Sequence, residues 1–236
     1  MNNTIIIEKR FCGPPDSGNG GYVCGLLAGN IQGVATVTLR KPPPLETALR
    51  VEVIDGGKVV LKDRDSIIAE ARPSSLDMEI PAPPTFEDAQ QATRTYLSPE
   101  EHFFPTCFVC GPARTAGDGL RIFPSSVPGT SLVASPWIPD KSLCDGSGRI
   151  RPEFVWASLD CPGAFAVLDK NLSPVVLGEL TAQIIRLPVP DEPYIVVGWE
   201  LSRKGRKRFA GTALYSRSGE IFGMGKAVWI ELTRVS

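Results

Sequence analysis

With 236 residues, the chain is long enough for one large domain or two small ones, and its 22 prolines and 23 glycines predict many turns. Its 25 Lys and Arg residues nearly balance its 26 Asp and Glu residues, so charge gives no reason to expect nucleic acid or an anionic membrane as a partner. No apolar run approaches the roughly 18 residues of a membrane span, and the one in "MNNTIIIEKR" (1–10) is too short for a signal peptide. The six cysteines are dispersed, and without a secretion signal we expect reduced thiols in a cytoplasmic protein.

The first half of the chain predicts one apolar helix among several strands. The helix spans about residues 18–29, and because three glycines at its start lower its intrinsic helix propensity, packing has to stabilise it. A leading strand is expected at 4–12, and β-rich runs with turn signals follow at 33–41, 48–55, 58–63 and 66–72. A further helix is predicted at about 86–97, with Thr85 and Asp88 spaced as a capping pair.

The second half predicts the same order of elements. It has a leading strand at 119–138, an apolar helix at about 152–168, and strands at 175–187, 194–202, 206–216 and 220–233. Pro152 suits the first turn of the helix, whereas Pro162 would remove a backbone hydrogen bond in its interior and clash with the carbonyl of Ser158. We therefore expect the helix to kink or break just after Asp160.

The two halves are also related in sequence. "GYVCGLLAG" (21–29) aligns with "EFVWASLDC" (153–161), and "VTLRKPPP" (37–44) aligns with "QIIRLPVP" (183–190). One duplicated unit fits this pattern better than a solenoid, which needs at least three copies. We predict an α+β protein in which residues 1–80 and 118–236 each form a long apolar helix wrapped by a bent antiparallel sheet, with 81–117 as the connector. The two sheets should join edge to edge, because exposed strand edges promote aggregation.

A helix with glycines at its start, wrapped by a bent sheet, resembles the hotdog fold. In particular, "GNGGYVCGLLA" (18–28), "VTLRKPPPL" (37–45) and "LRVEVIDGGKVV" (49–60) resemble the helix, strand, proline corner and hairpin of the acyl-CoA thioesterase-type double-hotdog family. The second half resembles the same pattern more loosely. The resemblance implies hydrolysis of an acyl-CoA or similar thioester without a metal or other cofactor. It also implies a CoA-linked substrate as the partner, and it is compatible with a homodimer.

The same resemblance places the family's catalytic acid on Asp160, where the first repeat has Ala28. This carboxylate lies in an otherwise apolar run, "PEFVWASLDCPGAFAV" (152–167), and its burial costs several kcal/mol unless it is paired, hydrogen-bonded or protonated. Thr181 fits the family's hydroxyl-bearing strand position. The amide position falls near Trp229, which lacks an amide's acceptor, and Gln183 can substitute only if its side chain faces inward.

The start of the first helix supplies candidate donors for a developing oxyanion. Backbone N–H groups at a helix start have no intrahelical acceptor, and Gly20 and Gly21 leave that start sterically open. Asn19 could add an amide donor. The alternative for these glycines is close packing of the helix against the sheet.

Two other interpretations of the sequence remain open. A non-enzymatic protein that binds an acyl or other apolar ligand in the same cleft is favoured by Trp229, whereas the contrast between Asp160 and Ala28 favours an enzyme. His102, Cys107, Cys110 and Cys144 together could form a tetrahedral zinc site. A single C-x2-C pair more often packs as small apolar side chains, so we expect no metal. The only histidine lies outside both repeat helices, which disfavours a hotdog dehydratase.

Overall fold

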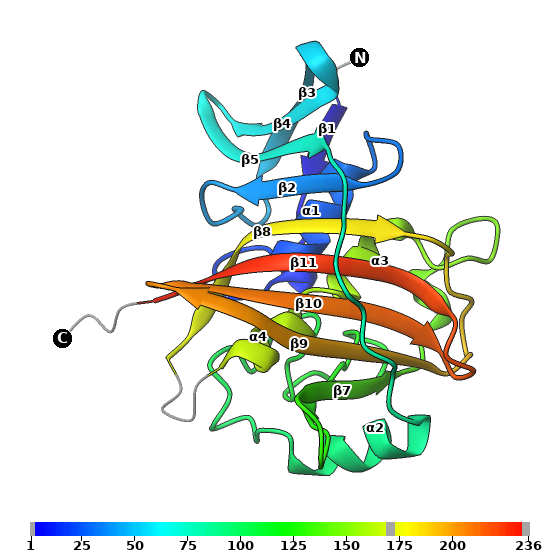
Figure 1. Ribbon diagram of the computed structural model, residues 1–236. Coiled ribbons are helices and arrows are strands. Elements are labelled where there is room, and N and C mark those ends of the chain that lie inside the picture. Colours follow the sequence, from blue (N-terminus) through cyan, green and yellow to red (C-terminus); the bar gives the residue numbers. More distant parts are fainter. Residues whose placement is uncertain (1–2, 169–172, 233–236) are drawn as a thin grey trace.

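The computed structural model describes residues 3–168 and 173–232, which form one large antiparallel sheet with short helices packed against it (Figure 1). The sheet has eleven strands in the order β1-β3-β4-β5-β2-β8-β11-β10-β9-β7-β6. The first five along the chain are β1 (Asn3–Ile6), β2 (Ala35–Leu39), β3 (Ala48–Ile54), β4 (Lys58–Asp63) and β5 (Ser66–Pro73). The others are β6 (Ser125–Ser126), β7 (Leu132–Trp137), β8 (Val175–Ile184), β9 (Tyr194–Lys204), β10 (Lys207–Ser216) and β11 (Ile221–Glu231).

The predicted edge-to-edge junction of two repeats is confirmed. Strands β1 to β5 occupy one end of the sheet and β6 to β11 the other, and the two groups meet where β2 pairs with β8 in antiparallel register, with Thr36 opposite Thr181. Away from this junction the strand order runs 5-4-3-1 on one side and 11-10-9-7 on the other, where the short strand β6 follows at the edge. The two half-sheets are therefore built alike and are joined where β2 pairs with β8.

The leading strands are shorter than predicted. In the first half β1 ends at Ile6, and a 3-10 turn at Lys9–Phe11 follows it. In the second half the predicted strand 119–138 is a hairpin of β6 and β7, whose turn contains Gly129 at φ 76°. The last strand was predicted to reach residue 233, which lies outside the described residues.

The helices are also shorter than the long helix predicted for each repeat. In the first half, α1 (Gly20–Ala28) has nine residues. In the second half, α3 (Pro152–Ser158) and α4 (Cys161–Val167) are separated by a break at Leu159 and Asp160, where the Asp160 backbone has φ −80° and ψ −81°. The helix breaks as predicted, although the break includes Leu159 and Asp160 and does not follow Asp160, and Pro162 lies in the first turn of α4, where its missing N–H costs nothing.

The connector crosses the sheet and carries α2 (Phe86–Ala92), which is shorter than the predicted helix 86–97 because a 3-10 turn replaces its last part. Its predicted cap is confirmed, since Thr85 Oγ1 accepts a hydrogen bond of 3.0 Å from the Asp88 N–H. Between β5 and α2 the chain passes over the sheet face opposite α1 and α3 (Figure 1). There Met78 and Ile80 pack on a second apolar cluster of buried side chains. No helix in the described part of the chain has the length and apolarity needed to cross a membrane.

Helices α1 and α3 lie side by side under the junction, and glycine allows their close approach. A Cβ atom on Gly25 would lie 2.5 Å from Glu153 Cα and 2.8 Å from Trp156 Cβ, which is closer than side chains tolerate. A Cβ on Gly21 would lie 2.5 Å from Asp160 Cβ. The glycines that weaken α1 as an isolated helix therefore let it pack against its partner and bring its start to Asp160.

We expect Gly25→Ala to destabilise the protein by about 3 kcal/mol, because the added methyl group must push α1 away from the backbone of α3. Gly29→Ala is the matched control: this residue ends the same helix in the right-handed helical region, with its nearest neighbour at 3.5 Å from the added Cβ. It should be neutral or stabilising by up to about 1 kcal/mol. Urea denaturation of both variants measures the difference, and equal stabilities would contradict the close packing of α1 on α3.

Candidate functional site

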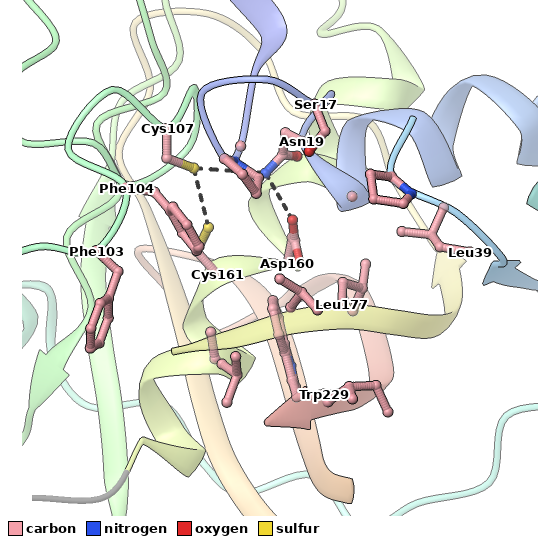
Figure 2. Close-up of a pocket in the computed structure, with 18 of the residues that line it drawn as sticks. Ser17, Asn19, Leu39, Phe103, Phe104, Cys107, Asp160, Cys161, Leu177 and Trp229 are labelled. Atoms are coloured by element: carbon pink, nitrogen blue, oxygen red, sulfur yellow. Dashed lines mark hydrogen bonds between the residues drawn. The ribbon is translucent and has the colours of Figure 1, made fainter. Parts of the chain in front are cut away.

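An apolar pocket with a volume of about 570 Å³ lies beside the start of α1. Its walls come from both repeats and from the connector: the residues before α1, the start of α4, strands β8 and β11, and the segment around 102–110. Figure 2 shows the apolar side chains that surround it, among them Leu39, Phe103, Phe104, Leu177 and Trp229. Such a pocket, mostly apolar with a few polar groups, is the usual form of a small-molecule site.

Asp160 is the carboxylate of this pocket, and only 2% of its surface is exposed. Its Oδ2 atom accepts two hydrogen bonds of 2.9 Å, one from Asn19 Nδ2 and one from the Gly21 N–H. Its Oδ1 atom is buried and has no hydrogen-bond partner among the described residues. Burial raises the pKa of Asp160 to about 7, although the hydrogen bonds from Gly21 and Asn19 act in the opposite direction. The carboxylate is therefore held in place through one oxygen, while the other has no partner among the described residues.

The start of α1 is organised by Asn19. As the N-cap, it accepts a hydrogen bond of 2.9 Å from the Tyr22 N–H through its Oδ1 atom, and its Nδ2 donates to Asp160. Gly20, the first helical residue, lines the pocket, and its N–H has no acceptor within the described residues. A side chain at Gly20 would approach Leu177 to 2.9 Å, so glycine keeps this position open. Gly20 and Asp160 therefore line the same pocket, and each has a polar atom without a partner among the described residues.

The structure brings together five of the seven predicted site residues. Asp160, Asn19, Gly20 and Gly21 meet as expected, and Trp229 forms an apolar wall of the same pocket. The indole Nε1 of Trp229 is buried without a partner among the described residues, at a position where Gly163 leaves room for the ring.

Thr181 and Gln183 do not join the site. Their neighbours Leu180 and Ala182 are buried in the core beneath α1, so strand alternation directs Thr181 and Gln183 to the opposite face of the sheet. The Thr181 hydroxyl pairs with that of Thr36 at 2.7 Å, across the junction of the two repeats. The position of Thr181 thus supports a role in joining the repeats rather than in contacting a ligand.

The four residues considered as zinc ligands are also not gathered at one point. His102 Nδ1 accepts a hydrogen bond of 2.9 Å from the Phe104 N–H, and its Nε2 lies 2.9 Å from the Tyr96 hydroxyl. Burial lowers the pKa of His102. Cys144 is outside the one cluster of three cysteine thiols found within the described residues. That cluster contains Cys161, which sequence reasoning did not consider as a ligand.

The segment around 102–110 is the part of the pocket that sequence reasoning missed. It belongs to the predicted connector, yet Phe103, Phe104, Cys107 and Cys110 all line the pocket. The available signal was the aromatic and cysteine-rich run "HFFPTCFVC" (102–110), because such a concentration of apolar side chains is unusual in a solvent-exposed linker.

No family model matches the sequence, and no curated protein is similar to it in sequence. Solved structures are nevertheless similar over nearly the whole chain. One is a conserved protein of unknown function with a hot dog fold from Alicyclobacillus acidocaldarius, with 9% identity, a TM-score of 0.62, and 98% of this chain and 93% of that chain covered. Another is an acyl-CoA thioesterase II from Mycobacterium marinum, with 12% identity, a TM-score of 0.61, and coverage of 98% and 93%. The tesB protein of Mycobacterium avium subsp. paratuberculosis has 14% identity, a TM-score of 0.60, and coverage of 92% and 88%.

The chain has the double-hotdog fold of thioesterase-like proteins. In this double hotdog the two repeats contribute different parts to one site. The first repeat supplies the helix start with its free donor, and the second supplies Asp160 at the break between α3 and α4. The hydrogen bonds from Asn19 and Gly21 to Asp160 cross from one repeat to the other. The site therefore depends on correct packing of the two repeats.

Proposed function

We propose that the protein hydrolyses an acyl-CoA or a similar thioester in this pocket. The observation that carries the proposal is that one apolar pocket is lined by Asp160, whose Oδ1 has no partner among the described residues, and by Gly20, whose N–H has no acceptor among them. Thioester hydrolysis requires a base or nucleophile and a donor for the oxyanion, and these two groups supply one of each. The similarity in fold to thioesterases supports the same reaction class.

In the proposed reaction, Asp160 Oδ1 accepts a proton from a water molecule while the oxygen of that water attacks the thioester carbonyl. The carbonyl oxygen gains negative charge and is stabilised by the Gly20 N–H at the positive end of α1. Collapse of the tetrahedral intermediate breaks the carbon–sulfur bond. The leaving sulfur takes the proton from Asp160 and departs as a thiol. Direct attack of Oδ1 on the carbonyl, followed by hydrolysis of the resulting anhydride, uses the same two groups.

The lining of the pocket supports an apolar acyl group on the substrate. Its walls are formed by aliphatic and aromatic side chains, which would lose contact with water when the acyl group binds. Arg40 and Lys41 also line the pocket, and the Arg40 side chain remains more than half exposed in its ion pair with Glu70. These cations are suited to the anionic phosphates of a CoA-type carrier at the solvent side of the pocket.

The proposal is tested by incubating the protein with acyl-CoA thioesters that carry straight, branched and aromatic acyl groups. Free CoA is separated and quantified by chromatography, so that the protein's own cysteines do not contribute to the signal. We expect hydrolysis of at least one class of apolar thioesters well above the rate without protein. If several acyl-CoA compounds raise the melting temperature and none is hydrolysed, the protein is a non-enzymatic acyl-binding module and the proposal is wrong.

A further inference from the structure

Three buried cysteines meet at one wall of the pocket. The Sγ atoms of Cys107, Cys110 and Cys161 all lie within 4.8 Å of one another, and those of Cys107 and Cys161 are 3.8 Å apart (Figure 2). Two zinc–sulfur bonds of about 2.3 Å at a tetrahedral angle place the sulfur atoms about 3.8 Å apart. Cys107 and Cys161 thus have the separation that a shared metal ion requires, the Cys110 sulfur lies within 4.8 Å of both, and all three are free cysteines.

The turn "CFVCG" (107–111) carries the first two of these cysteines, Cys107 and Cys110. The turn is closed by the Gly111 N–H, which donates to the Cys107 carbonyl at 2.9 Å, and a Cβ on Gly111 would lie 2.5 Å from that carbonyl oxygen. Only glycine fits there, and the C-x2-C spacing is one that metal-binding turns use.

Cys107 Sγ also accepts a hydrogen bond from a side chain of the first repeat. The donor is Asn19 Nδ2, which lies 3.8 Å from this sulfur atom and also donates to Asp160. A donor beside a ligand sulfur is an outer-shell contact expected at a metal site.

The third cysteine comes from a distant part of the chain. Cys161 is the first residue of α4, and the helix break before it turns its side chain toward the 107–110 turn. All three cysteines line the pocket, and no fourth His, Cys, Asp or Glu of the described residues joins the cluster. Three protein ligands with one open position is the arrangement of metal sites that bind a water molecule or a substrate.

We propose that Cys107, Cys110 and Cys161 bind one zinc ion in the wall of the pocket, with the fourth coordination position open to the pocket. Zinc fits because thiolate ligands and a tetrahedral arrangement select it over magnesium, calcium or manganese, which prefer oxygen ligands. The ion would join the connector to the second repeat. A ligand in the pocket would then meet a Lewis acid beside the carboxylate of Asp160.

The first test measures metal content after purification under reducing conditions without added chelator. We expect about one zinc ion per wild-type chain by elemental mass spectrometry, and a decrease to near zero in Cys107→Ser and Cys161→Ser. Cys144→Ser is the matched control, because Cys144 is a free, partly exposed cysteine outside the cluster, and it should keep the full zinc content. Loss of zinc in the control, or wild-type protein without zinc, would overturn the proposal.

A second test does not depend on the folding of the variants. Wild-type protein is stripped of metal, kept reduced, and titrated with Co²⁺, which replaces zinc in tetrahedral sites and absorbs light. We expect thiolate-to-cobalt charge-transfer bands and visible bands of tetrahedral cobalt that saturate at one ion per chain and disappear when zinc is added. Absence of these bands from reduced, folded protein would overturn the proposal. Both tests read metal binding, so their outcome is independent of whether the protein hydrolyses thioesters.

Discussion

The Asp160→Asn variant is expected to hydrolyse thioesters about 10²-fold more slowly than the wild type, or slower still, because it lacks the proposed base. The asparagine carbonyl oxygen can still accept both hydrogen bonds, from Asn19 and from the Gly21 N–H, so the helices should remain packed. Substrate affinity should change much less, since the interaction lost is one of the transition state. Steady-state turnover and a thermal melt on the same preparation measure both quantities.

Thr181→Val is the matched control for this experiment. It removes a hydroxyl on the opposite face of the sheet and leaves Thr36 without its partner at 2.7 Å, so it should cost about 1 kcal/mol of stability and leave turnover nearly unchanged. Full turnover in folded Asp160→Asn protein would show that the carboxylate only helps to hold the two repeats together. A large loss of turnover in Thr181→Val with little loss of stability would restore the catalytic role that the family resemblance implies for Thr181.

Gly20→Pro should lower kcat by about 10²- to 10³-fold relative to Gly20→Ala, the range for removal of one oxyanion donor. Proline lacks the N–H, and it is well tolerated as the first residue of a helix. The preceding Asn19 has φ −59° and ψ 130°, which is the extended conformation that a following proline requires. The backbone of α1 should therefore accept the substitution.

Gly20→Ala is the reference because it introduces the same Cβ atom against Leu177 and keeps the N–H. Any loss that both variants share reports crowding of the pocket, and only the difference between them reports the donor. Turnover at saturating substrate is compared for the two, with their melting temperatures as a check on folding. Equal turnover of the proline and alanine variants would exclude the Gly20 N–H from the reaction.

Much of the fold could be predicted from the sequence because it follows from local chemistry. Alternating and apolar runs located most strands, the internal similarity indicated two repeats, and Pro162 predicted the helix break. Helix length could not be predicted in this way. A continuous apolar run does not distinguish one long helix from two short ones whose relative direction is set by packing.

The direction in which Thr181 and Gln183 point could not be predicted for a different reason. Strand β8 has a bulge at Gly178, where its pairing with β11 shifts between Val228 and Trp229. Side chains that face inward are Val175 and Leu177 before the bulge, but Leu180 and Ala182 after it. An uninterrupted alternation from Leu177 would turn Thr181 and Gln183 inward, and the extra residue reverses this. A bulge of one residue is set by the pairing between strands and leaves no signal in the strand's own sequence.

Pro152, the first residue of α3, has a consequence for the symmetry of the molecule. The internal repeat aligns it with Gly20, the first residue of α1, just as it aligns Asp160 with Ala28. The second repeat thus has a proline without an N–H where the first has a free donor, and the first repeat has a methyl group where the second has a carboxylate. Of the two positions that the duplication relates, one combines a free backbone donor with a carboxylate, and the other has neither. The chain is therefore a dimer-like scaffold with a single candidate site, and the start of its second helix can contribute to packing alone.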